Sequence, residues 1–224
     1  MSFTYHFWYT LSKIVARLFF GFRIVHRERM IEEGPVILAS NHQSYFDPPL
    51  VGICSRRGVY YLARKTLLQV PLLGKLLPEI NVIPVDRDGN DMSALKAVIR
   101  TVKAGNGVLL FPEGTRSPDG KLLPGKAGIG LVIAKTRAPV QPVRIFGSHE
   151  AFPKGSGKIS AVPITVVVGE AIRFSDAELD PEGCGGDERA LYQMLSDRVM
   201  AAIAELSLPE SLPTQGRKAN LSHS

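Results

Sequence analysis

The sequence predicts an α/β fold in which a mixed, mostly parallel central sheet is flanked by helices. Short apolar runs of strand length alternate along the chain with longer stretches of helical periodicity, the pattern of layered α/β proteins. Polar residues follow directly after several apolar runs, as expected where strands end at the edge of an open sheet. With 224 residues, 45% of them hydrophobic, the chain is long enough for one sizeable core. We therefore expect a main domain at residues 31–208, an amphipathic segment before it at residues 1–30 and a flexible tail at residues 209–224.

The N-terminal segment has apolar and aromatic residues at spacings of three to five, which predicts one face of a helix. These residues are Phe3, Phe7, Trp8, Leu11, Ile14, Val15, Leu18, Phe19 and Phe22. Charges at Lys13 and Arg17 interrupt the segment, whereas a membrane-spanning helix needs ~20 mostly apolar residues. Residues 1–30 carry five basic residues and one acidic residue. We expect this helix to lie on an anionic membrane surface; a helix docked on the protein's own core is the alternative.

The remaining strands and helices are expected from their periodicity and their end signals. Short runs rich in β-branched or aromatic residues predict strands at residues 36–39, 59–63, 80–85, 107–111, 140–146 and 159–169, and residues 23–30 are expected to form a short connection or a first strand. The last of these alternates and suits an antiparallel partner. Amphipathic stretches bounded by Pro, Asp, Ser or Gly predict helices at residues 48–57, 91–104, 128–136 and 188–206.

A polar stretch follows the apolar run 36–39, with His42 and Asp47 separated by four residues. A strand ending near Ser40 would bring His42 to the rim of the sheet, and the Pro48-Pro49 turn could return Asp47 beside it. The carboxylate would then fix the imidazole tautomer and leave the other ring nitrogen free to take a proton from a hydroxyl. A simple capping loop is the alternative for this pair considered alone.

A second polar stretch, residues 111–117, reads Phe-Pro-Glu-Gly-Thr-Arg-Ser and follows another apolar run. Together with Asn41-His42-x4-Asp47 it resembles the glycerolipid acyltransferase family that includes 1-acylglycerol-3-phosphate acyltransferase. Residues 81–87 and 138–143 also match the family in order and spacing, so the resemblance covers roughly residues 34–150. The middle stretch departs from many relatives, which have Gly and Phe where this chain has Asn81 and Pro84.

The resemblance implies an acyltransferase domain that gives phosphatidate from 1-acyl-glycerol-3-phosphate. His42 is implied as the general base toward the acceptor hydroxyl and Asp47 as the group that orients it, with acyl-CoA or acyl carrier protein as donor. Backbone N–H groups around Gly114 or in the His42 loop would stabilise the negative oxygen that develops. No Gly-x-Ser-x-Gly motif occurs, and neither Cys54 nor Cys184 has a basic neighbour within its own segment that would mark it as a nucleophile, so we expect no acyl-enzyme.

The resemblance also implies the residues that bind substrate. Arg87 and Arg116 suit the acceptor phosphate because guanidinium groups are always charged and offer a fork of donors. Glu113 is expected to orient an arginine or a substrate hydroxyl. Further candidates for contacts with acceptor or donor are Asn41, Ser44, Gly114, Thr115, Lys65 and Lys126.

The net charge of +6 favours an anionic partner, which could be nucleic acid, an anionic membrane or a phosphorylated substrate. No nucleic-acid-binding motif and no zinc-type cluster is found in the sequence, so we expect no nucleic acid, no metal and no cofactor beyond the acyl donor. Two cysteines agree with a reducing compartment, and we expect peripheral or monotopic attachment to the cytoplasmic face of the cell membrane. Two alternatives remain: another lysophospholipid or amino-acid lipid as acceptor, and a non-catalytic membrane-binding module.

Overall fold

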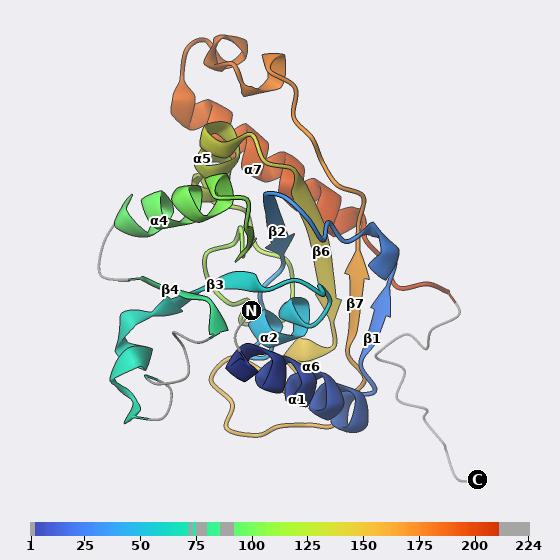
Figure 1. Cartoon of the computed structure of the whole chain (residues 1–224). Helices are drawn as coiled ribbons and strands as arrows, with labels where there is room; N and C mark the ends of the chain where they lie inside the picture. Colours follow the sequence, from blue (N-terminus) through green and yellow to red (C-terminus); the bar gives the residue numbers. More distant parts are fainter. Residues whose placement is uncertain (1–2, 72–73, 75–79, 86–91, 211–224) are drawn as a thin grey trace, which may run out of the picture.

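A computed structural model describes residues 3–71, 74, 80–85 and 92–210, without the side chains of Arg64 and Leu68. Its strands form one sheet: β1 (Arg23–Val25), β2 (Val36–Ser40), β3 (Val59–Arg64), β4 (Val82–Val85), β5 (Gly107–Leu110), β6 (Val140–Phe146) and β7 (Thr165–Val168). The helices are α1 (Phe3–Phe20), α2 (Asp47–Gly52), α4 (Met92–Lys103), α5 (Ala127–Thr136), α6 (Ser148–Ala151) and α7 (Glu188–Glu205), with short 3-10 turns between some elements. Figure 1 shows the sheet with helices on both sides.

Within the described residues, the strand order is β1-β7-β6-β2-β5-β3-β4. The strands from β6 to β4 are parallel, β7 is antiparallel to β6, and β1 is parallel to β7. The predicted mixed, mostly parallel sheet is therefore confirmed, as is the antiparallel strand near the C-terminus. Strand β2 lies between β5 and β6, and Ala39 is in register with both Leu110 and Pro142. The carboxyl ends of β2, β5 and β6 consequently meet at one edge of the sheet.

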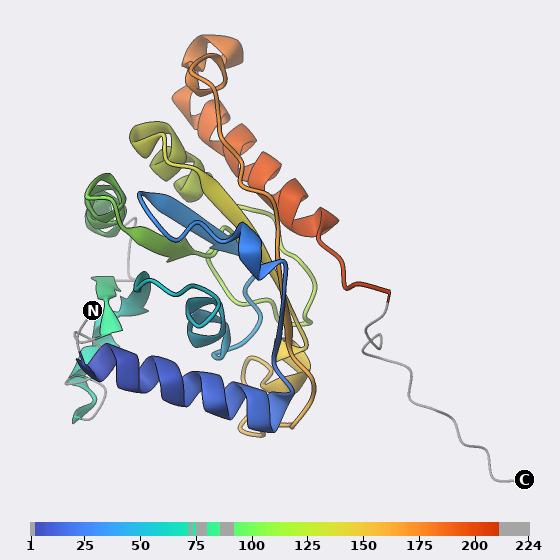
Figure 2. The ribbon, with the colours of Figure 1, turned by 45° about the vertical axis from the view of Figure 1, so that its right-hand side comes forward.

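The two faces of the sheet bury separate clusters of side chains, because neighbouring residues of a strand point to opposite faces. In β2, Ile37 and Ala39 pack with residues of α4, α5 and α7, whereas Val36 and Leu38 pack with residues of α1 and α2. Figure 2 shows α1 on its side of the sheet, with α4, α5 and α7 on the other. Helices α5 and α7 approach closely because Gly130 has no side chain: a Cβ there would lie 1.9 Å from the Tyr192 carbonyl oxygen.

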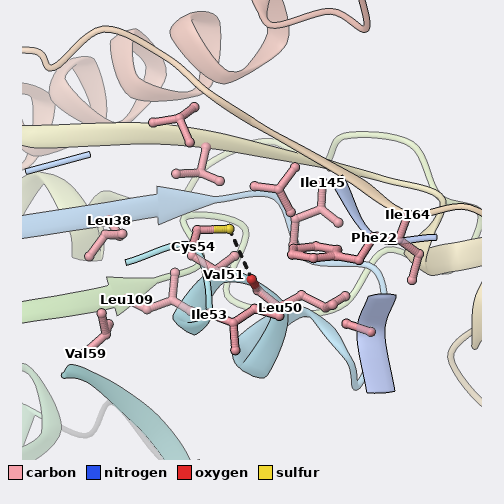
Figure 3. Close-up of a cluster of buried hydrophobic side chains, with 14 of the residues drawn as sticks. Phe22, Leu38, Leu50, Val51, Ile53, Cys54, Val59, Leu109, Ile145 and Ile164 are labelled. Carbon is pink, nitrogen blue, oxygen red and sulfur yellow. Dashed lines mark hydrogen bonds between the residues drawn. The ribbon is translucent and has the colours of Figure 1, made fainter. Parts of the chain in front are cut away.

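The cluster between the sheet and α2 is closely packed (Figure 3). Leu50 and Val51 of α2 share this cluster with Leu38 and Leu109, and the Cys54 thiol donates a hydrogen bond to the Leu50 carbonyl (3.2 Å). Burial raises the pKa of the Cys54 thiol, so this sulfur stays neutral. Cys54 is therefore a core residue.

Helix α1 confirms the N-terminal helix, and it has both a docked and an exposed side. Tyr5, Ala16 and Phe20 are buried, and the Val59 N–H donates to the Tyr5 hydroxyl (3.2 Å), which fastens the helix to β3. Most of the predicted apolar residues are exposed instead, including Phe3 (88%) and Leu18 (76%). None of the helices described is long and apolar enough to cross a bilayer.

Three expectations are corrected by the structure. Phe22 does not belong to the apolar face of the helix, because it follows α1 and is buried in the core beneath it. The strand expected at 159–169 is confined to Thr165–Val168, since Pro163 has no N–H for a ladder hydrogen bond. The helix expected at 48–57 ends at Gly52, because the N–H groups of Arg56 and Arg57 donate to the Glu32 carboxylate instead.

Candidate active site

The candidate site lies at the edge where the carboxyl ends of β2, β5 and β6 meet. His42 and Asp47 follow β2, Glu113 follows β5, and Ser148 begins α6 directly after β6. Because the three strands are adjacent and parallel, residues from distant parts of the sequence converge there. The sequence-based placement of the His42 and Glu113 loops at the rim of the sheet is thus confirmed.

The imidazole of His42 is hydrogen bonded to the Asp47 carboxylate, with 2.9 Å between Nδ1 and Oδ2. A carboxylate can only accept, so Nδ1 carries the hydrogen and Nε2 is left as the proton acceptor. The Phe111 ring stacks on the imidazole at 3.9 Å between ring centroids and 15° between planes, which fixes the ring orientation. The His42 side chain remains 12% exposed, so a substrate can reach the ring.

Asp47 is completely buried, and four donors satisfy its carboxylate. Besides His42, Oδ2 accepts from the backbone N–H groups of Gln43 (2.6 Å) and Ser44 (2.7 Å), while Oδ1 accepts from the Ser148 hydroxyl (2.6 Å). The Gln43 side-chain amide in turn donates to the Ser148 oxygen (3.1 Å). A buried charge needs such partners, and here they also fix which oxygen faces the imidazole.

Sequence reasoning missed Ser148 and Gln43. Ser148 is 101 residues from Asp47, so no local spacing links the two. Its signal is its position immediately after a strand that neighbours β2, the same signal that marks His42 and Glu113.

Two residues that were predicted to contact substrate form hydrogen bonds within the protein. The Asn41 amide donates to the Ile145 carbonyl (3.0 Å) and accepts from the Ile145 N–H (2.7 Å), so it pairs with the β6 backbone. The Ser44 hydroxyl donates to the Phe152 carbonyl (3.0 Å). Both residues are buried, and these bonds hold the loop in place; a contact of either residue with substrate stays a prediction.

The Glu113 carboxylate joins two loops of the protein. Oε1 accepts from the His42 N–H (3.0 Å) and Oε2 from the Leu123 N–H (3.3 Å). Burial raises the pKa of Glu113 to about 7, with a smaller contribution from the negative charge of Asp47 and an opposing effect of the two backbone donors. The Glu113 carboxylate thus positions the His42 loop.

Most of the backbone N–H groups that were predicted to stabilise the oxyanion already donate hydrogen bonds within the protein. Those of His42, Gln43 and Ser44 donate to carboxylates, and the Gly114 N–H donates to the Phe111 carbonyl (3.0 Å). Among the described residues, the N–H groups of Thr115 and Arg116 have no acceptor. These two amides follow Gly114, whose φ of 66° turns the chain here and favours glycine.

Arg116 lies across the face of Tyr45, with its guanidinium carbon 3.4 Å from the ring centroid. Its Nη1 is buried and has no hydrogen-bond partner in the described part of the chain. An unpaired donor of this kind suits an anionic oxygen.

The other basic residues predicted to bind substrate are Lys126, Lys65 and Arg87. Lys126 is exposed and lies beside Gly114, where an added Cβ would come within 3.1 Å of its Cδ. Lys65 follows β3, two strands from β2 at the same edge of the sheet. Arg87 lies outside the described residues. No group of side chains suited to a metal ion is found in the described ranges.

This fold and this site define an α/β protein in which a buried carboxylate orients an imidazole at the carboxyl edge of a parallel sheet. The family model named Acyltransferase matches residues 22–146, more than half of the chain. The chain therefore belongs to the acyltransferase family, and the resemblance to glycerolipid acyltransferases is confirmed.

Two similar relatives are named 1-acyl-sn-glycerol-3-phosphate acyltransferase. The chain is 27% identical over 176 residues to 1-acyl-sn-glycerol-3-phosphate acyltransferase of Bacillus subtilis, covering 77% of this chain and 84% of that protein. It is 34% identical over 149 residues to the chloroplastic 1-acyl-sn-glycerol-3-phosphate acyltransferase BAT2 of Brassica napus, covering 65% of this chain and 43% of BAT2. The chain thus spans about half the length of the plant relatives it matches.

One solved structure is similar over most of the chain. It is the 1-acyl-sn-glycerophosphate acyltransferase PlsC of Thermotoga maritima, with a TM-score of 0.70 and 25% identity, covering 91% of this chain and 81% of that one. The lyso-ornithine lipid O-acyltransferase of Brucella abortus is 28% identical over 90% of this chain and 83% of its own length.

Proposed function

We propose that this protein transfers a fatty acyl group from an acyl thioester to the free hydroxyl of 1-acyl-glycerol-3-phosphate, which gives phosphatidate. The observation that carries the proposal is the 2.9 Å contact between His42 Nδ1 and a buried Asp47 whose carboxylate is held by three further donors. The names of the relatives support this acceptor.

In the proposed reaction, His42 Nε2 takes the proton of the acceptor hydroxyl as its oxygen attacks the thioester carbonyl. A C–O bond forms, and the tetrahedral intermediate collapses by breaking the C–S bond. The imidazolium returns its proton to the departing thiolate, while Asp47 stabilises the positive charge between the two steps. The proposed attack is direct, because Cys54 is buried in the core and no serine or cysteine of the described residues is hydrogen bonded to the His42 imidazole.

The N–H groups of Thr115 and Arg116 are the donors best suited to the oxyanion. Both lack an acceptor among the described residues and follow the Gly114 turn, so they are free to donate to an anion. The Arg116 guanidinium, with its unpaired Nη1, would hold the acceptor phosphate, together with Arg87 and Lys126. Acyl-CoA or acyl carrier protein would supply the acyl group.

A second acceptor is favoured by one observation. The lyso-ornithine lipid O-acyltransferase of Brucella abortus matches 90% of this chain, a larger share than the phosphate-acceptor relatives from plants. An amino-acid lipid would be acylated by the same His42 chemistry, but it would need a different partner at Arg116.

Exposed apolar side chains of helix α1 support work at a membrane surface. The proposed location is the cytoplasmic face of the cell membrane. A lysolipid lies in the bilayer, and pulling its acyl chain into water would cost ~0.8 kcal/mol for each methylene group. The exposed apolar side chains of α1 would let the protein stay at the surface and avoid this cost.

The test is acyl transfer by the intact protein, measured with both donor types and a panel of lysophosphatidate, other lysophospholipids and an amino-acid lysolipid. His42→Ala is expected to lower turnover by ~10²–10⁴, the usual contribution of a positioned general base. The matched control is His149→Ala, which removes another imidazole near this edge that has no bond to Asp47. Normal turnover in folded His42→Ala protein would refute the mechanism. Transfer only to the amino-acid lysolipid would show that this lipid, and not 1-acyl-glycerol-3-phosphate, is the acceptor.

A further inference from the structure

A second basic pocket lies away from the His42 site, between α1 and the edge strand β1. Its volume is about 500 Å³. Four cationic side chains line it: Lys13, Arg17, Arg23 and Arg27. Phe22 and Ile24 contribute apolar walls. None of these residues belongs to the loops that follow β2, β5 or β6, so the pocket is separate from the proposed catalytic machinery.

Within the described residues, no acidic side chain balances the positive charge of this pocket. No described carboxylate forms an ion pair with any of the four cations, and no acidic residue is among those that line the pocket. The Arg27 Nε–H donates to the Cys54 carbonyl (3.0 Å), but Arg27 Nη2 is buried without a partner in the described chain. Desolvation, Arg27 and Arg17 lower the pKa of Lys13. A cluster of like charges held together in this way is stabilised by an anion.

The position of the pocket on α1 indicates where that anion comes from. Lys13 and Arg17 are four residues apart and therefore lie on one side of the helix. Ile14 and Leu18 each follow one residue later, about 100° further around the helix, and share an exposed apolar strip with Phe7. Leu18 is 76% exposed and Phe7 54%. If this strip enters a bilayer, Lys13 and Arg17 come to the depth of the lipid phosphates.

We propose that this pocket binds the phosphate group of an anionic membrane lipid, as a discrete site distinct from the site that holds the acceptor. Two or more guanidinium groups offer forked donors to phosphate oxygens, and Arg27 provides one from the wall of the pocket rather than from the helix surface. The volume admits a headgroup and not only a bare phosphate. The inference goes beyond the proposed reaction and shares with it only the membrane contact of α1.

The test measures binding of the full-length protein to vesicles in the absence of an acyl donor, so turnover plays no part. Vesicles of phosphatidylcholine alone are compared with vesicles that also contain phosphatidylglycerol, an anionic lipid that is neither acceptor nor product of the proposed reaction. The variant Lys13→Gln/Arg17→Gln is matched by Lys96→Gln/Lys103→Gln, which removes two exposed charges from α4 on the opposite face of the sheet.

The pocket variant is expected to bind the anionic vesicles about 30-fold more weakly, since each basic group near the surface contributes about fivefold. The α4 variant is expected to bind like the unaltered protein. Arg27→Gln should weaken binding about fivefold, whereas Arg27→Lys, which keeps the charge, should weaken it less. Thermal unfolding of each variant confirms that the protein is folded.

Competition separates the possible sources of the anion. Short-chain phosphatidylglycerol, inorganic phosphate and coenzyme A are each added to the protein bound to anionic vesicles, and the lipid is expected to displace it best. Equal losses in the pocket variant and the α4 variant would overturn the proposal, because they would indicate a diffuse charge effect. Normal binding by folded Arg27→Gln would overturn it as well, and so would stronger displacement by coenzyme A, which would assign the pocket to the donor.

Discussion

Replacing Asp47 with Asn tests how the carboxylate acts on His42. From the sequence alone, the amide would be expected to present its NH₂ group to the imidazole and so favour the wrong tautomer. The structure argues otherwise, because the oxygen facing His42 also accepts the N–H groups of Gln43 and Ser44 at 2.6 and 2.7 Å. These two donors would keep the Asn carbonyl oxygen in that position and direct its NH₂ toward the Ser148 oxygen.

The expected loss in kcat follows from the weaker hydrogen bond between the Asn side chain and His42 Nδ1. The hydrogen bond to Nδ1 survives in neutral form, so the change is from a charged acceptor, worth about 1.5–3 kcal/mol, to a neutral one, worth about 0.5–1.5 kcal/mol. A difference of roughly 1–2 kcal/mol corresponds to a loss in kcat of about 5- to 30-fold. The wrong tautomer would instead cost about 10⁴-fold.

The assay is turnover with purified protein at saturating acceptor and donor, alongside His42→Ala. Asp47→Ala is the contrasting variant: it leaves four donors around a buried hole without an acceptor, each at a cost of about 1–3 kcal/mol, so it should unfold at a much lower temperature. If folded Asp47→Asn protein is as inactive as His42→Ala, the two backbone donors do not control the amide, and this reasoning is refuted.

Three further predictions concern the acceptor, the pH dependence of stability and the membrane. Arg116→Ala should raise the acceptor KM about 10- to 100-fold and leave the donor KM nearly unchanged, because a charge-assisted contact is worth ~1.5–3 kcal/mol; steady-state kinetics with each substrate varied measures this. Because burial raises the pKa of Glu113 to about 7, the stabilisation from its neutral form is complete below pH 4.5 and is lost as the pH rises through about 7. Glu113→Gln should remove this loss from urea unfolding curves recorded across that range. Phe7→Ser/Leu18→Ser should weaken sedimentation with vesicles without lowering the unfolding temperature, since both side chains are exposed.

Each of these three predictions would be contradicted by a specific result. Equal changes in the two KM values would assign Arg116 to something other than the acceptor phosphate. A Glu113→Gln protein whose stability falls over the same pH range as that of the unaltered chain would assign the loss to another group. Unchanged vesicle binding by the Phe7 and Leu18 variant would place the membrane contact elsewhere on the molecule. Point changes are preferred to deletion of α1, because Ala16 and Phe20 are part of the core.

The sequence was informative where one local segment determines the result. His42 and Asp47 pair because only four residues separate them along a single turn, and the buried strand before them positions that turn. The periodicity of the N-terminal segment also predicted α1 within a few residues of its ends.

It was less informative where two distant segments meet. The roles of Asn41, Ser44 and Glu113 depend on which backbone groups of Ile145, Phe152 and Leu123 face them, and this is set by sheet order and register. Phe22 was misplaced for a related reason: its spacing continues the helix, but the chain turns at Gly21, whose φ is 48°, and enters the core.

The dependence of the His42 loop on neighbouring strands has a consequence for how the protein folds. The bonds that hold it join residues 71, 101 and 104 positions apart, so the loop cannot reach its final geometry until β5 and β6 have docked on β2. Such long-range contacts carry a large loop-closure entropy and form slowly. During refolding, helical signal should therefore return before acyl-transfer activity, and a nascent chain that ends before Ser148 would carry every catalytic residue of the proposed mechanism without a working pair.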